Sequence, residues 1–135
     1  MAEARIHHRV QWGETDAAGI VFYPNYFRWF DQGVHEIFRA AGFSVAAMRE
    51  RGYSIPLIEA GARFRAALEY DTEVVIESRV SEVRSRSFRV DHVVRRGEEI
   101  ALEGHDVRIW ARLLPDVGVD AERIPLEMRR LIEPA

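Results

Sequence analysis

Residues 13–27 read GETDAAGIVFYPNYF, and this stretch joins a polar segment to a position where a helix can begin. The acids Glu14 and Asp16 come first, and the small residues 17–19 leave the backbone exposed. Pro24 stands where a helix can begin, because the N–H that proline lacks would be unpaired in the first helical turn anyway. The spacing predicts a functional loop that leads directly into a helix.

The segment from Pro24 to Ala41 has the apolar periodicity of an amphipathic helix. Its apolar residues recur at intervals of three and four positions: Phe27, Phe30, Val34, Ile37, Phe38 and Ala41. Gly42 is suited to the left-handed position that ends a helix. A helix of about 17 residues is roughly 25 Å long, so its apolar side needs a broad surface to cover it.

The second half of the chain supplies that surface as strands. Runs rich in Val, Ile, Phe and Arg occupy residues 53–68, 73–84, 87–95 and 99–113, and RIHHRVQW at 5–12 adds a fifth strand. In the run at 73–84, Val74, Ile76 and Val80 alternate with charged residues, which predicts an antiparallel sheet with one buried face.

The run at 99–113 shows the same alternation. We expect Val107, Ile109, Ala111 and Leu113 to face inward and Asp106, Arg108 and Arg112 to face outward. The segments EYDT at 69–72 and RRGE at 95–98 are expected to be hairpin turns. With short helices at 44–51 and 126–133, the prediction is an α+β fold in which a five-stranded antiparallel sheet wraps one long helix.

Composition limits the classes of protein that this chain can represent. A length of 135 residues fits one domain. The chain is 47% apolar and 30% charged with a net charge of −3, which argues against a disordered or strongly nucleic-acid-binding protein. There is no Cys, so thiolate nucleophiles and Cys-based metal sites are excluded. No apolar run approaches the roughly 18 residues of a membrane span, and the beginning MAEARIHHRV lacks the apolar stretch of a signal peptide, so we expect a cytoplasmic protein.

Nearly the whole chain resembles the hot-dog fold thioesterases, and within them the 4-hydroxybenzoyl-CoA thioesterase family. The resemblance is sharpest at 9–42, where an acid three residues after Gly13 precedes a Gly-hydrophobic pair, and Tyr-Pro-Asn-Tyr opens the helix. A second match is EVRSRSF at 82–88. The resemblance implies hydrolysis of an acyl-CoA thioester without a metal or redox cofactor. It also implies a homodimer, or a dimer-of-dimers homotetramer, with sheets joined edge to edge and sites between subunits.

The opening stretch contains what thioester hydrolysis requires, namely a group that attacks or activates water and a donor for the carbonyl oxygen. Asp16 can serve as the first, and the N–H of Tyr23 at the helix start as the second. Asp16 could instead simply cap a turn, and Glu14 could be the acid, but the resemblance places the essential carboxylate at Asp16. Nucleophilic attack and general-base catalysis both fit this carboxylate, and the resemblance favours direct attack with a transient mixed anhydride.

Asp31 borders the apolar side of the predicted helix. It could form a surface pair with His35 at i+4 or Arg28 at i−3. In the family that the chain resembles, a matching acid approaches the ring hydroxyl of an aromatic acyl group. The resemblance therefore implies that Asp31 binds a hydroxylated aryl substrate.

Arg84, Ser85 and Arg86 lie at a junction between two predicted strands. Two guanidinium groups and a hydroxyl could hold the phosphates of a nucleotide through charge-assisted hydrogen bonds, although solvated Arg residues in a turn would look the same. The resemblance implies that this turn binds CoA.

The five His residues show no spacing typical of metal ligands, so we predict no metal site. Two other functions stay open. The same fold could act on short aliphatic acyl-CoA or carrier-bound acyl chains, or it could bind acyl-CoA without catalysis. A hot-dog hydratase fits less well, because such enzymes carry a catalytic His on the helix.

Overall fold

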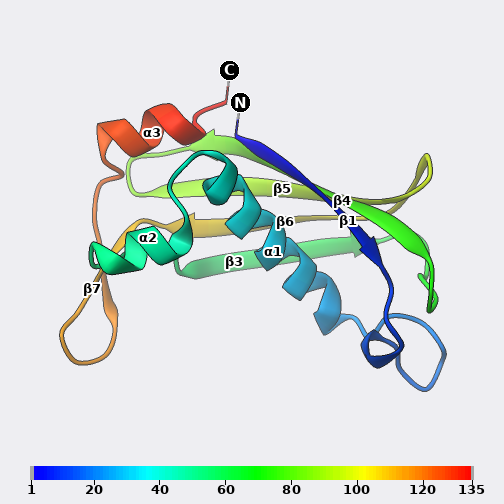
Figure 1. Cartoon of the computed structure of the whole chain (residues 1–135). Coiled ribbons are helices and arrows are strands. Elements are labelled where there is room, and N and C mark those ends of the chain that lie inside the picture. The colour runs from blue at the N-terminus through cyan, green and yellow to red at the C-terminus, as the bar shows by residue number, and fades with distance from the viewer. Residues whose placement is uncertain (1, 135) are drawn as a thin grey trace.

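The computed structural model describes residues 2–134, and its main feature is a curved sheet around one long helix (Figure 1). The sheet has five antiparallel strands in the order β1-β4-β5-β6-β3. Their bounds are β1 Glu3–Arg9, β3 Leu57–Phe64, β4 Glu73–Val83, β5 Ser87–Arg96 and β6 Glu99–Ile109. The predicted α+β class and five-stranded sheet are confirmed, and the free edges are β1 and β3.

The long helix α1 runs from Pro24 to Ala40, as its periodicity predicts. It ends before Gly42, whose φ of +87° lies in the left-handed region that favours glycine. The side facing the sheet buries large side chains, among them Trp29, Phe30 and Phe38. Burial of each such side chain is worth about 1.5–3 kcal/mol, so this face holds the helix on the sheet.

Two short helices follow the predicted positions, with α2 at Val45–Glu50 and α3 at Leu126–Ile132. Two of the predicted long strands are interrupted. After β2 (Tyr53–Ser54) the chain passes Pro56, which has no N–H for a strand ladder, before β3 begins. Similarly, β7 (Ala111–Leu113) separates from β6 at Trp110, and β2, β7 and β8 (Val119–Ala121) form a small second sheet.

One of the two predicted hairpins is correct. Residues 95–98 join the neighbouring strands β5 and β6, with Gly97 at a φ of +60°. Residues 69–72 do form a turn, in which Asp71 has a φ of +69°, but the hairpin prediction is wrong because β3 pairs with β6 and β4 lies between β1 and β5. Turn residues indicate that the chain reverses, and they carry no information about which strand it then joins.

The predicted orientation of β6 is also wrong. Asp106 and Arg108 face inward and are buried, whereas Val107 and Ile109 are partly exposed. A shift of one residue moves every side chain of a strand to the other face. In β6 the burial of Leu102 determines which alternate residues face inward, and Asp106 and Arg108 are among them. Their charges are tolerated in the interior because they form an ion pair with each other. Beyond the break at Trp110, Ala111 is buried and Arg112 is exposed, as predicted.

Among residues 2–134, no helix combines the length and the apolar character that crossing a bilayer requires.

Candidate active site

The loop at residues 11–23, called the Asp16 loop, connects β1 to α1 and carries the predicted catalytic acid. Asp16 anchors a tight turn: its N–H donates to the Ile20 carbonyl (2.9 Å), and its Oδ1 accepts from the Ala18 N–H (2.9 Å). Asp16 therefore does cap a turn, and the same contacts orient its carboxylate. Among residues 2–134, Oδ2 has no hydrogen-bond partner, and the residue is exposed on the single chain.

Glu14 holds the Asp16 loop against the rest of the domain. Its Oε1 accepts from the Gln11 N–H (2.8 Å) and lies 2.7 Å from His8 Nε2, and its Oε2 accepts from Trp29 Nε1 (2.7 Å). Burial alone would raise the pKa of Glu14, but the hydrogen bonds from Gln11, His8 and Trp29 outweigh burial and lower that pKa. Because its two oxygens are engaged by three donors, Glu14 positions the loop and is not free to attack a substrate.

The backbone of Glu14 adds two further contacts. Its carbonyl accepts from the Phe22 N–H (2.8 Å) near the end of the loop and from Asn25 Nδ2 (2.9 Å) in the first turn of α1, so the two halves of the loop are held together and to the helix. Sequence reasoning weighed Glu14 only as an alternative acid. The pattern of Gln11 and Glu14 at i and i+3 around a short 3-10 helix, η1 (Trp12–Glu14), is a capping box and could have indicated the structural role.

Tyr23 is the N-cap of α1, and its N–H has no acceptor among residues 2–134. Such an N–H at a helix start can donate to an incoming anion. Tyr26 lies one turn further on. Burial raises the pKa of Tyr26, a hydrogen bond with the Leu68 backbone partly offsets this rise, and the negative charge of Asp16 adds a smaller increase. The Asp16 loop and the first turn of α1 therefore form one polar region.

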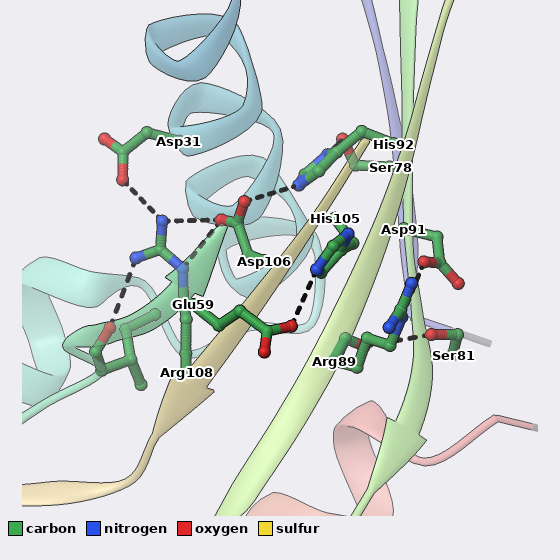
Figure 2. A network of polar contacts seen from close by, with 11 residues as sticks. Asp31, Glu59, Ser78, Ser81, Arg89, Asp91, His92, His105, Asp106 and Arg108 are labelled. Atoms are coloured by element: carbon green, nitrogen blue, oxygen red, sulfur yellow. Dashed lines mark hydrogen bonds and ion pairs between the residues drawn. The ribbon is translucent and has the colours of Figure 1, made fainter. Parts of the chain in front are cut away.

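A second polar region lies beneath α1 and is called the buried polar cluster: Ser78, His92, Asp106 and Arg108 (Figure 2). Ser78 Oγ is 2.7 Å from His92 Nδ1, and His92 Nε2 is 3.4 Å from Asp106 Oδ1. Arg108 donates to Asp106 Oδ2 from Nε (3.0 Å) and Nη2 (2.9 Å). Burial would raise the pKa of Asp106, but His92 and Arg108 outweigh it and lower that pKa.

The buried polar cluster extends to Asp31, because Arg108 Nη2 also donates to Asp31 Oδ1 (3.0 Å). The predicted surface pair is present as well, with His35 Nε2 3.7 Å from Asp31 Oδ2. Arg28 makes no ion pair with Asp31 in the described part of the chain. The sequence did not indicate Arg108 as the main partner of Asp31, because Arg108 was expected on the outer face of β6. Arg108 is separated from Leu102 and Trp110 by even numbers of positions, so it lies on the same face of the strand as these two apolar residues, and this spacing is the signal that could have identified it.

The predicted CoA-binding residues form the turn between β4 and β5. The turn is exposed and is held from behind, since Ile124 and Trp110 donate backbone N–H groups to the Ser85 and Arg86 carbonyls (both 2.9 Å). The Arg84 side chain pairs with Glu82 (2.7 Å). The groups available to a ligand are therefore the exposed side chains at the tip.

Within one chain, this turn and the Asp16 loop lie at opposite ends of the sheet (Figure 1). The residue just before the loop is bound next to the beginning of β4, because the Val10 N–H donates to the Thr72 carbonyl (2.9 Å). The turn follows the end of the same strand, and 11 residues of strand span about 35 Å. A single chain therefore does not bring Arg84, Ser85 and Arg86 together with Asp16.

The edge strand β3 carries exposed apolar side chains at both ends, and of these Phe64 lies near the start of α1, with its ring centroid 5.6 Å from that of Tyr26. Leu57, Ile58 and Phe64 are each about half exposed (51%, 58% and 52%), and Tyr23 in the loop is 60% exposed. A groove of about 850 Å³ lies on the open face of the sheet among charged residues such as Arg5 and Asp91, and Asp16 does not line it. One chain alone thus leaves Asp16 uncovered.

In the part of the chain from residue 2 to residue 134, no group of three His, Asp or Glu side chains is arranged to hold a metal ion. The absence of a cofactor stays a prediction.

Comparison with known proteins identifies relatives that share this architecture. The family model described as "Thioesterase-like superfamily" matches residues 10–123. A "4-hydroxybenzoyl-CoA thioesterase" from Pseudomonas sp. (strain CBS-3) is 31% identical over 114 residues, which cover 78% of this chain and 81% of that protein. A "Putative esterase" from Aquifex aeolicus (strain VF5) is 35% identical over 94 residues, which cover 70% of this chain and 73% of that protein.

Solved structures of thioesterases are also similar to this chain. A gentisyl-coenzyme A thioesterase superposes with a TM-score of 0.86 at 32% identity, covering 93% of this chain and 99% of that chain. A 4-hydroxybenzoyl-CoA thioesterase mutant in complex with 4-hydroxybenzoyl-CoA superposes with a TM-score of 0.88 at 26% identity, covering 98% of this chain and 100% of that chain.

Proposed function

This chain belongs to the thioesterase-like superfamily, and on that premise we propose that it hydrolyses the thioester of an aromatic, hydroxylated acyl-CoA. The products are the free acid and CoA. The relatives named above act on 4-hydroxybenzoyl-CoA and gentisyl-CoA, which supports this class of substrate. The reaction requires no cofactor beyond the CoA of the substrate.

The observation that carries the proposal is that Asp16 Oδ2 and the Tyr23 N–H lie on the same short loop and have no hydrogen-bond partner among residues 2–134. The carboxylate of Asp16 is oriented by the turn at residues 16–20. The Tyr23 N–H, aided by the α1 dipole, can stabilise the negative charge that grows on the thioester carbonyl oxygen. The proposed nucleophile and oxyanion donor thus lie on one short loop, which Glu14 ties to His8 on β1 and to Asn25 on α1.

In the mechanism that we favour, an Asp16 oxygen attacks the thioester carbon. The C–S bond breaks, CoA leaves as the thiolate and takes a proton from water, and the acyl group is left as a mixed anhydride with Asp16. Water then attacks the anhydride, which releases the acid and restores the carboxylate. If Asp16 instead removes a proton from an attacking water, the same residues take part without the covalent intermediate.

The proposed active unit is a homodimer in which two β3 edges pair. A twofold axis through such an edge places the two β3 strands antiparallel, so opposite ends of the two sheets lie side by side. The turn at residues 84–86 of one copy then comes to the same end as the Asp16 loop of the other. Arg84, Ser85 and Arg86 of the second copy would bind the CoA phosphates, and its β3 side chains would cover Asp16. Further association of dimers into a tetramer is compatible with this arrangement.

A thiol-release assay tests the proposal with benzoyl, hydroxybenzoyl, phenylacetyl and short alkyl CoA thioesters. We expect the hydroxybenzoyl thioesters to be hydrolysed fastest, and Asp16→Asn to lower kcat by about 10²- to 10⁴-fold, the range for loss of a catalytic acid or base. Asp120→Asn, on β8 in the small sheet, is a matched control and should keep full activity.

The outcomes separate the alternatives. Equal activity of Asp16→Asn and the wild type would remove the mechanism. Preference for short alkyl thioesters would indicate an aliphatic acyl-CoA thioesterase, and binding of acyl-CoA without release of thiol would indicate a non-catalytic module.

A further inference from the structure

Arg108 is held rigidly by acceptors from three parts of the chain. Besides Asp106 on its own strand, it donates to the Ile55 carbonyl from Nη1 (3.3 Å) and to Asp31 on α1 from Nη2 (3.0 Å). Four of its five N–H groups are therefore engaged. Its side chain is 8% exposed, so its position is fixed before any ligand binds.

Asp31 is the member of this chain of contacts that reaches the surface. Its side chain is 52% exposed, whereas the side chains of Arg108 and Asp106 are 8% and 4% exposed. One oxygen, Oδ1, is bound to Arg108, and the other, Oδ2, lies 3.7 Å from His35 Nε2, which is too long for a hydrogen bond. Within residues 2–134, Asp31 thus presents one oriented oxygen that accepts no hydrogen bond.

The contact with Arg108 also bears on the chemistry of that oxygen. Oδ1 accepts a hydrogen bond from the Arg108 guanidinium, and the second oxygen of a carboxylate likewise offers only acceptor sites. A ligand group at Oδ2 must therefore be a donor such as a hydroxyl or an amine. A halogen of similar size offers no hydrogen, and a carboxylate would be repelled.

Asp31 and the Tyr23 N–H lie on the same helix, eight residues apart, which is about 12 Å of helix rise. Side chains on a helix lean towards its N-terminus, so the Asp31 carboxylate lies closer to Tyr23 than its backbone does. One helix thus carries both the donor-binding oxygen and the N–H that we propose as the oxyanion donor.

We propose that Arg108 is a specificity-determining residue, which acts by orienting Asp31 so that the enzyme selects acyl groups carrying a hydrogen-bond donor on the ring. The inference rests on the proposed function, but it concerns selectivity and not the hydrolytic step. Arg108 does not touch the substrate; it is a positioning residue that acts through Asp31.

The test compares Arg108→Lys, Asp31→Asn and the double variant. Lysine keeps the positive charge beside Asp106, so the fold is less perturbed, but a single ammonium cannot reproduce the planar fork that binds both Asp106 and Asp31. Arg39→Lys, in the exposed pair with Glu36 on α1, is the control for an Arg-to-Lys change away from the site. The selectivity is the ratio of kcat/KM for the preferred hydroxybenzoyl-CoA isomer over the matching fluorobenzoyl-CoA.

We expect Arg108→Lys and Asp31→Asn each to lower the selectivity about tenfold or more, the effect of one hydrogen bond to a charged group. The double variant should show no further loss, because both changes remove the same oriented oxygen. The proposal is overturned if Arg108→Lys reduces kcat/KM equally for both substrates, or if the two losses multiply.

A binding measurement makes the test independent of hydrolysis. Non-hydrolysable thioether analogues of the same two acyl-CoA molecules are titrated into each variant. If the wild type releases no thiol from any substrate, the proposed function fails, yet a preference of the wild type for the hydroxyl analogue that Arg108→Lys loses would still support the role of Arg108. Equal affinity of the wild type for both analogues would overturn it.

Discussion

The two polar regions of this domain differ in how complete they are within one chain. The buried polar cluster beneath α1 has its charges paired by side chains from β5, β6 and α1. The Asp16 loop is also held firmly, through Glu14, but among residues 2–134 Asp16 Oδ2 and the Tyr23 N–H have no hydrogen-bond partner. The contrast is in keeping with our proposal that one chain builds the acyl end of the site, whereas a ligand and a second copy complete the reacting end.

The largest expected effect comes from removing one charge from the buried polar cluster. Arg108→Met leaves the buried carboxylate of Asp106 without its cation and should lower the free energy of unfolding by about 3–5 kcal/mol. Denaturation in urea measures the change. The double variant Asp106→Leu and Arg108→Met removes both charges and should recover most of the loss. A loss below about 1 kcal/mol for the single variant would show that the pair is not buried in solution.

A change that prevents a second copy from covering the Asp16 loop should lower activity and leave stability unchanged. Ile58→Lys places a charge on the exposed edge strand β3, where a second copy would pair. We expect a monomer by sedimentation and a loss of activity of about 100-fold, with little change in the melting temperature. Leu131→Lys, at an exposed apolar site on α3, is the control. A fully active monomer would contradict the shared site.

A smaller effect is expected where α1 approaches the sheet most closely. A Cβ at Gly33 would lie 2.1 Å from Ser78 Oγ, so Gly33→Ala should force α1 away and cost about 1–3 kcal/mol. Thermal unfolding measures this cost. Gly13→Ala in the Asp16 loop meets no atom within 4 Å and should change stability by less than about 0.5 kcal/mol. Equal effects of the two substitutions would contradict the close packing at Gly33.

The smallest effect concerns pH. The pKa of Glu14 is lowered from its usual 4.5 and that of Asp106 from its usual 3.8, so the unfolded chain binds more protons than the folded one as pH falls. The stabilisation is complete above pH 4.5 and is lost as pH falls through the folded values. Between pH 5 and pH 3, the free energy of unfolding of Glu14→Gln should fall by roughly 1 kcal/mol less than that of the wild type. Denaturation at each pH measures the difference. An unchanged slope would exclude Glu14 as a source.

The sequence predicted those parts of the fold that local patterns govern. The periodicity from Pro24 to Gly42 defined α1 because one helix face is buried along its whole length. The hairpin at 69–72 and the orientation of β6 were predicted wrongly, because strand pairing and parity depend on contacts distant in sequence.

The same limit applies to the site. Motif residues such as Asp16 and Tyr23 could be proposed from one continuous segment. The contact between Asp31 and Arg108 spans 77 positions of the sequence, and charged residues in a strand are ordinarily expected at the surface. Local sequence patterns therefore do not predict the long-range pairing of buried charges.

Gly33 and Gly104 have a consequence for how the enzyme would choose among acyl groups. A Cβ at Gly104 would lie 2.3 Å from the Phe30 ring, just as one at Gly33 would strike Ser78. These two close approaches hold α1 in one position on the sheet, which keeps Asp31 within hydrogen-bond reach of Arg108. Selectivity that depends on this contact would favour acyl groups whose donor meets Asp31 Oδ2 at that one position.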